Sequence, residues 1–180
     1  PLIQPVNGSG GKVEGYEFAA ALEGGLLLPA LEGFGVVVSG SKLSSSVTEQ
    51  LPGQVDKTIP LNGLSGRSNS LTVYYEGHGF QARLAQRYRS PFTATTRDIY
   101  FNSTTHQYAA DKVLDAQLGY AFDEGALKGA SLLFQVLNLQ NKPTNNFVNV
   151  GNNAPDGSQL LPNITRYYGR QLLLGVNYKL

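Results

Sequence analysis

Apolar and polar residues alternate at every second position over long stretches of this 180-residue chain. Side chains of a β-strand point alternately to opposite faces, so a period of two predicts a strand between an apolar and a polar environment. The pattern predicts about seven strands and no helix of comparable length, which makes the expected fold all-β. These strands lie near residues 15–22, 34–39, 70–76, 80–89, 113–122, 129–140 and 171–180.

The connections between these strands alternate in length. Residues 23–33, 76–79 and 122–129 are short links, whereas residues 44–66, 90–110 and 142–166 are long, polar and rich in Asn, Thr, Ser, Gly and Pro. In an antiparallel meander, all the short turns then lie at one end of the sheet and all the long loops at the other. This asymmetry is typical of outer-membrane β-barrels. The sequence therefore predicts an antiparallel meander that is a segment of a large transmembrane β-barrel.

Composition argues against several other classes of protein. The chain has no Cys, which excludes disulfides and thiolate metal sites, and its net charge of +1 argues against a nucleic-acid partner. No apolar run reaches the roughly 20 residues of a membrane helix. His78 and His106 have no partners at metal-ligand spacing, and no Gly-x-Ser-x-Gly nucleophile motif occurs. We therefore expect no enzyme activity, no metal and no cofactor.

Charged and amide side chains gather on the polar side of two expected strands. Arg83, Arg87 and Arg89 share one face of residues 80–89, and Asp115 and Gln117 lie on the polar face of residues 113–122. In a barrel this face lines the lumen, where it would meet a plug or an anionic substrate. The alternative is a solvated, ion-paired face without a ligand.

Aromatic residues suggest two further roles. Phe92, Tyr100, Phe101 and Tyr108 lie in an expected external loop and suit stacking against a ligand, although a loop without a ligand is the alternative. Several tyrosines lie near strand ends or on apolar faces, which predicts an aromatic girdle at the membrane surface, with ordinary strand packing as the alternative. These are Tyr74, Tyr75, Tyr88, Tyr120, Tyr167, Tyr168 and Tyr178.

The end of the chain resembles the assembly signal of outer-membrane proteins. Gly175, Tyr178 and Leu180 match its glycine, aromatic and terminal hydrophobic positions, although the usual last residue is Phe. Other segments resemble, in the right order, the C-terminal part of TonB-dependent receptors. They are residues 11–17 (GKVEGYE), 29–35 (PALEGFG), 88–90 (YRS), 129–143 with its NLQNKP ending, and 168–170 (YGR).

This resemblance implies a barrel of about 22 strands with a plugged lumen. Residues 1–180 would form its C-terminal segment, with the plug, the other strands and the TonB-contacting motif outside them. The implied partners are outer-membrane lipid, the barrel-assembly machinery, TonB through a region absent here, and a small substrate. The implied function is uptake of a carbohydrate or siderophore-like ligand across the bacterial outer membrane.

Two other classes of protein stay open from the sequence. A soluble β-sandwich that serves as a binding or adhesion module would pack its apolar faces together in a closed core, whereas a barrel segment would leave them exposed. An enzymatic outer-membrane barrel would need a clustered nucleophile and base, and the sequence offers no clear pair.

Overall fold

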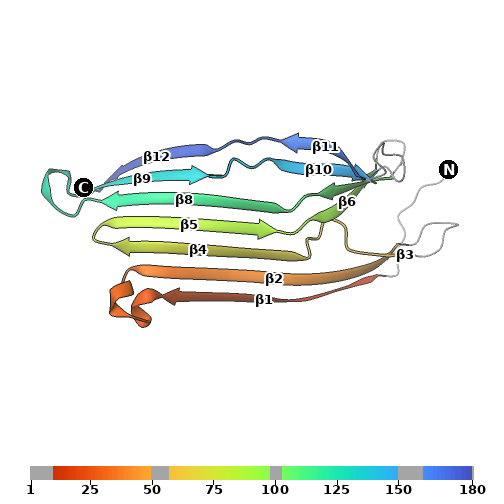
Figure 1. Cartoon of the computed structure of the whole chain (residues 1–180), viewed down its shortest axis with the longest axis horizontal. Coiled ribbons are helices and arrows are strands. Elements are labelled where there is room, and N and C mark those ends of the chain that lie inside the picture. Colours follow the sequence, from red (N-terminus) through yellow and green to blue (C-terminus); the bar gives the residue numbers. More distant parts are fainter. Residues whose placement is uncertain (1–9, 50–56, 98–102, 150–159, 180) are drawn as a thin grey trace.

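The computed structural model describes residues 10–49, 57–97, 103–149 and 160–179. Within them the fold is all-β and every strand pair is antiparallel, which confirms the fold class that the alternation predicted. The main sheet has the strand order β1-β2-β4-β5-β8-β9-β12 (Figure 1). Its strands are β1 (Gly11–Glu23), β2 (Phe34–Glu49), β4 (Arg67–Gly77), β5 (Phe80–Arg89), β8 (Asp111–Ala121), β9 (Ala130–Leu137) and β12 (Gln171–Tyr178), and the short β3 (Lys57–Ile59) pairs with the end of β2.

A second, four-stranded sheet continues the main one. Its strands are β6 (Phe92–Arg97), β7 (Ser103–Tyr108), β10 (Thr144–Asn149) and β11 (Leu160–Arg166), in the order β11-β10-β7-β6. Beyond short breaks, β6 extends β5, β7 extends β8, β10 extends β9 and β11 extends β12. The strands therefore keep the same order in both sheets (Figure 1). The expectation that residues 90–110 and 142–166 are long loops was therefore wrong. Their described parts form two strand pairs, and residues 44–66 contain the end of β2 and all of β3.

The three short connections lie together at one end of the main sheet, as the meander required (Figure 1). The connection between β1 and β2 contains two 3-10 turns, η1 (Gly24–Leu26) and η2 (Pro29–Leu31), and the connection between β8 and β9 contains one, η3 (Gly125–Leu127). The third is a two-residue turn in which His78 and Gly79 have φ of 53° and 76°. Two consecutive positive φ values define a type I′ turn, whose twist matches that of the strands it joins.

Each short connection ends in a glycine with positive φ, directly before the first residue of the next strand. Gly33, Gly79 and Gly129 have φ of 84°, 76° and 87°, and each carbonyl accepts a hydrogen bond of 2.8–2.9 Å from a backbone N–H in the neighbouring strand or directly after it. A Cβ at Gly79 would lie 2.5 Å from a carbonyl oxygen of β8. Any larger residue would therefore push the turn away from the strand that it is bonded to.

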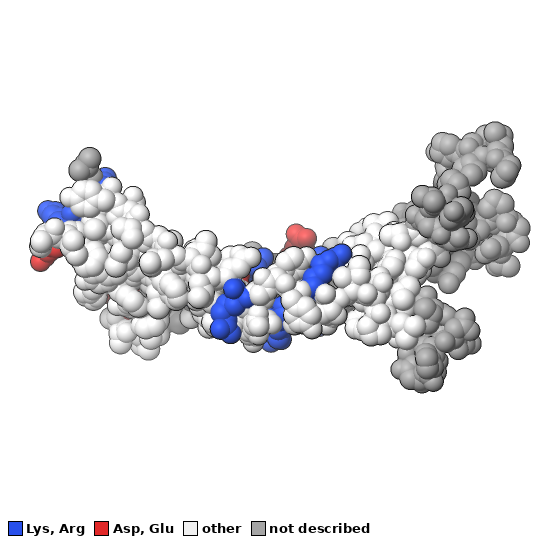
Figure 2. Space-filling model, turned by 90° about the horizontal axis from the view of Figure 1, so that it is seen from above, with Lys and Arg blue, Asp and Glu red and all other residues white. Residues whose placement is uncertain are grey.

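The described strands form an open sheet rather than a closed barrel, with β1 and β12 at its edges. Seen from above, it is a bowed slab whose visible surface is mostly uncharged (Figure 2). Among apolar side chains of the described residues, Val136 alone is buried, at 8% exposure. The fold is thus a single layer, without the packed interior of a two-layer domain.

Candidate functional site

Strand register collects the apolar residues of the main sheet on one face. Directly opposed residues of an antiparallel pair point to the same side. The register therefore links one apolar position on every strand into a row across the sheet. That row consists of Leu22, Val36, Val73, Leu84, Ala116, Val136 and Leu172.

The next row on the same face is as apolar as the first. It contains Phe34, Tyr75, Ala82, Leu118, Phe134 and Leu174, which are again joined by direct register. The alternation seen in separate segments of the sequence thus becomes one continuous surface. We call it the apolar face.

Nothing among the described residues covers the apolar face. On β12, Leu174 is 76% exposed and Val176 is 72% exposed, and Leu118 in the middle of the sheet is 48% exposed. Soluble monomers rarely expose contiguous apolar patches beyond a few hundred Å². The face therefore needs an apolar environment that these residues do not supply.

Aromatic residues border this face near the short turns. The rings of Phe34 and Tyr75 lie 4.7 Å apart, and the Tyr75 and Phe80 rings lie 6.2 Å apart. Tyr120 lies opposite Phe80, and Tyr178 occupies the same end of the last strand. Aromatic rows of this kind flank the apolar band of outer-membrane barrels.

Basic residues border the other end of the face. Lys42, Arg67 and Lys112 are exposed and point to the same side as the apolar face, two to four residues beyond the last aliphatic residue of that face on their own strands. From Phe34 to Lys42, β2 spans about 26 Å at roughly 3.3 Å per residue. At the tilt of about 40° that strands have in membrane barrels, this length projects to about 20 Å, somewhat less than the roughly 25 Å apolar band of such barrels.

The opposite face is polar and carries the charged residues that the sequence singled out. Arg83 lies opposite Gln117, and Arg87 forms an ion pair of 3.1 Å with Asp115. Gln117 accepts a hydrogen bond of 2.8 Å from the Gln135 side chain. The five predicted lumen residues therefore share one face, and the pairing of Arg87 agrees with the ion-paired alternative.

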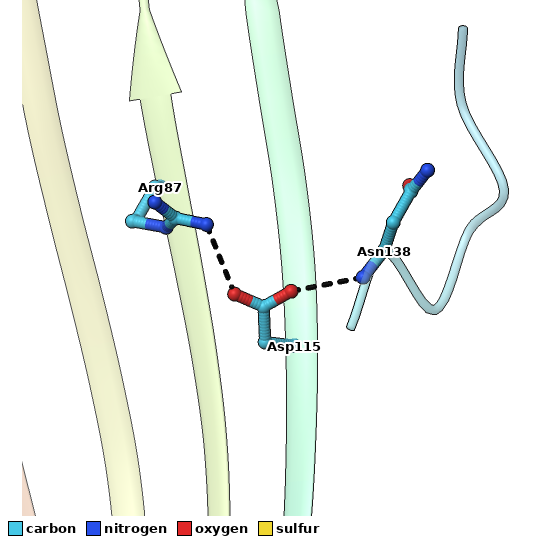
Figure 3. Close-up of polar contacts among 3 residues, drawn as sticks. All are labelled: Arg87, Asp115 and Asn138. Atoms are coloured by element: carbon cyan, nitrogen blue, oxygen red, sulfur yellow. Dashed lines mark hydrogen bonds and ion pairs between the residues drawn. The ribbon is translucent and has the colours of Figure 1, made fainter. Parts of the chain in front are cut away.

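Asp115 also fixes the break between β9 and β10. Its second carboxylate oxygen accepts the backbone N–H of Asn138 at 2.9 Å, so that one carboxylate bridges a strand and a bend (Figure 3). Asn138 has φ of 53°, and its side-chain amide donates to the carbonyls of Lys142 and Gly169. Sequence reasoning missed Asn138, because nothing in the local pattern links it to a carboxylate 23 positions earlier.

Two of the predicted ligand-binding aromatics lie in strands, not in loops. Phe92 in β6 stacks on Tyr108 in β7, with ring centres 4.7 Å apart and planes 2° from parallel. The Arg89 guanidinium lies 4.7 Å from the Phe92 ring centre, a cation–π contact. Their placement in a loop was thus wrong, and the Phe92 ring is engaged by its own chain. Tyr100 and Phe101 lie outside the described residues.

The expected assembly signal is only partly described. Gly175 lies on the polar face of β12, and Tyr178 is exposed at the end of the apolar face, while Leu180 lies outside the described residues. A Cβ at Gly175 would meet Leu133 at an ordinary 3.5 Å. Packing within the sheet therefore does not require glycine there.

Within the described ranges, no group of three His, Cys, Asp or Glu residues is arranged to hold a metal ion. The same part of the chain contains no helix long and apolar enough to cross a membrane. His78 lies in the two-residue turn, and the His106 ring lies 3.2 Å from the Asn163 amide.

The chain matches no protein-family model, no curated protein and no solved structure.

Proposed function

We propose that the chain is a membrane-spanning segment of an outer-membrane β-barrel, belonging to a TonB-dependent receptor that imports a small nutrient. The observation that carries this proposal is the uncovered apolar face, which runs across the seven long strands of the main sheet. The other side of the same strands is the polar face. Lipid is the environment that accepts one such face, while water in a lumen accepts the other.

The open edges support membership of a larger barrel. β1 and β12 each have a neighbouring strand on one side only within the described residues. In a bilayer, each unpaired backbone group costs several kcal/mol, so spanning sheets close into barrels. Further strands must therefore pair with both edges, as in the roughly 22-stranded plugged barrels of this receptor class.

The β-sandwich alternative lacks this support. A sandwich needs two layers whose inner faces interdigitate about 10 Å apart. The described part of the chain supplies one layer, with Val136 as its one buried apolar residue.

In the receptor, the polar face contributes to transport by lining the lumen. Arg83, Arg87 and the Gln117–Gln135 pair present donors and acceptors for a hydrated substrate or for the plug. The paired strands β6–β7 and β10–β11 extend the wall beyond the membrane, where a carbohydrate or siderophore-like ligand is first met. TonB-driven energy coupling belongs to regions other than these strands.

Detergent dependence of folding tests the proposal. For residues 1–180 and for the longer barrel that would contain them, we expect β-structure by circular dichroism in detergent or phospholipid but not in plain buffer, and for the longer barrel we expect a compact, heat-modifiable band on a gel. A cooperative, monomeric β-fold in plain buffer would reject the membrane segment and favour the soluble binding module.

A further inference from the structure

We infer that Lys42, Arg67 and Lys112 bind the phosphate of an anionic lipid head group, at the end of the apolar face that lies away from the short connections. This inference rests on the proposed membrane segment and adds a lipid-binding site to it. Lys42 lies directly opposite Arg67, and Lys112 lies directly opposite Tyr88, so all three point to the side of the apolar face. They belong to β2, β4 and β8, inside the sheet, so strands that pair with its open edges would not cover them.

The charge on this side of the main sheet is unbalanced. Besides the three basic residues, the described strands carry only Lys12 and Glu14 there, and these two form an ion pair with each other. None of the three makes an ion pair within the described part of the chain. Lys42 and Arg67 are directly opposed, and like charges in that position destabilise a sheet. An anion between the two side chains would remove this repulsion.

Neutral hydrogen-bonding side chains lie between the charges. Asn69 is directly opposite Tyr88, which is opposite Lys112, so these three form one row across β4, β5 and β8. Amide, phenol and ammonium groups can all donate to phosphate oxygens. Two strand spacings and two residues along the strand separate the Cα atoms of Arg67 and Lys112, which is about 12 Å. The ends of both long side chains can therefore reach one head group between them.

Depth in the proposed bilayer indicates a lipid as the source of the phosphate. The β2 stretch from Phe34 to Lys42 projects to about 20 Å, within the roughly 25 Å apolar band of a barrel. At the edge of this band, Lys and Arg lay their stems along apolar surface and extend their charged ends to the head groups. Val38 and Leu71 are opposed on the same face, closer to its middle. They would lie beside the acyl chains of the same lipid, which a free phosphate does not have.

A single tryptophan on the apolar face reports which lipid lies beside the site. Leu71→Trp places it on β4, two residues from Asn69, and Leu174→Trp on β12 is the distant control on the same face. The barrel that contains residues 1–180 is folded into vesicles of phosphatidylcholine and phosphatidylglycerol, in which one or the other lipid has brominated acyl chains. Residues 1–180 contain no Trp of their own, and the emission of the barrel without the introduced Trp is subtracted.

We expect quenching of Leu71→Trp to show a roughly fivefold preference for phosphatidylglycerol over phosphatidylcholine, about the effect of one basic residue at an anionic surface. Leu174→Trp should show no preference. Arg67→Gln should lower the preference at Leu71→Trp, and replacing Lys42 and Lys112 by Gln as well should abolish it. Arg83→Gln removes the same charge from the polar face of the neighbouring strand and should leave the preference unchanged.

Four results would overturn the inference and leave the proposed function standing. Equal quenching of Leu71→Trp by the two lipids would mean that no anionic lipid is selected. The same preference at Leu174→Trp, or a preference that survives all three Gln substitutions, would mean that these residues form no site. If inorganic phosphate removes the preference and sodium chloride of equal ionic strength does not, the site takes free phosphate instead. If neither lipid quenches Leu71→Trp or Leu174→Trp, the inference and the proposed function both fail.

Discussion

Two adjacent leucines on opposite faces of β12 can test whether the apolar face meets lipid and the polar face meets a water-filled lumen. Leu174 lies on the apolar face opposite Phe134, and Leu173 lies on the polar face opposite Gln135. Both are well exposed, at 76% and 45%, so neither is held by packing within the sheet. Replacing each in turn by Arg introduces the same charge at nearly the same depth but toward different surroundings.

The expected magnitudes follow from these positions. Leu174 lies within one residue of the middle of the β12 stretch from Leu172 to Tyr178, which places it near the membrane midplane in the proposed barrel. Arginine on the lipid face there costs about 2–4 kcal/mol, equivalent to a loss of roughly 30- to 900-fold in the folding equilibrium. Leu173→Arg faces the lumen, so we expect a change within about 1 kcal/mol.

The measurement is a urea titration in phosphatidylcholine vesicles, followed by circular dichroism, of the folded barrel that contains residues 1–180, unmodified and with each of the two substitutions. If the sheet instead functions in water, both exposed positions accept Arg at a cost of about 0.5 kcal/mol or less. Equal free energies of unfolding for Leu173→Arg and Leu174→Arg would therefore refute the assignment of one face to lipid.

Two further predictions concern the sheet itself, and denaturant midpoints measure both. Asp115→Ala should lower stability by about 1–2 kcal/mol, because it removes an acceptor for the Asn138 N–H as well as the exposed Arg87 ion pair. Asp115→Asn keeps that acceptor and should cost less than about 1 kcal/mol, so equal effects would contradict the role of the hydrogen bond. Gly79→Ala should cost clearly more than Gly125→Ala, because both have φ of 76° but only the first places a Cβ 2.5 Å from a carbonyl. Equal losses would show that backbone strain alone matters there.

Alternation along single strands was enough to anticipate the main sheet. In segments such as residues 113–122, apolar and polar residues occupy different faces, and the register then joins those faces without conflict. The I′ turn at His78 and Gly79 was also foreseeable, because the short gap left room for little else. Local chemistry and global fold agree in these regions.

The sequence pattern did not predict the second sheet, and the reason is physical. β6 (FTATTR) has only Phe92 and Ala94 as apolar residues on one face, and β7 (STTHQY) is polar up to its last residue, so neither strand shows a sustained period-two signal. β11 contains Pro162, and its pairing with β10 shifts register between Asn146 and Phe147. Such strands are held by backbone pairing with their neighbours, which no local window of sequence records.

The sequence predicted which charged residues share the polar face, but it did not predict which of them are in contact. Placing Arg87 and Asp115 on one face needed only the alternation, whereas their contact requires the register between β5 and β8. The bond from Asn138 requires in addition that the chain bend at that residue. Long-range geometry of this kind is decided by tertiary structure.

The breaks between the two sheets lie in facing pairs. Residues 90–91 separate β5 from β6 beside residues 109–110, which separate β7 from β8, and residues 138–143 face residues 167–170. The second pair is joined by side chains, since Asn138 donates to Gly169 and Arg170 donates to the Leu139 carbonyl. Because the strands are interrupted at each break, the number of residues in the second sheet does not fix the strand register of the main sheet. We therefore expect insertions or deletions in β6–β7 or β10–β11 to leave the strand register of the main sheet unchanged.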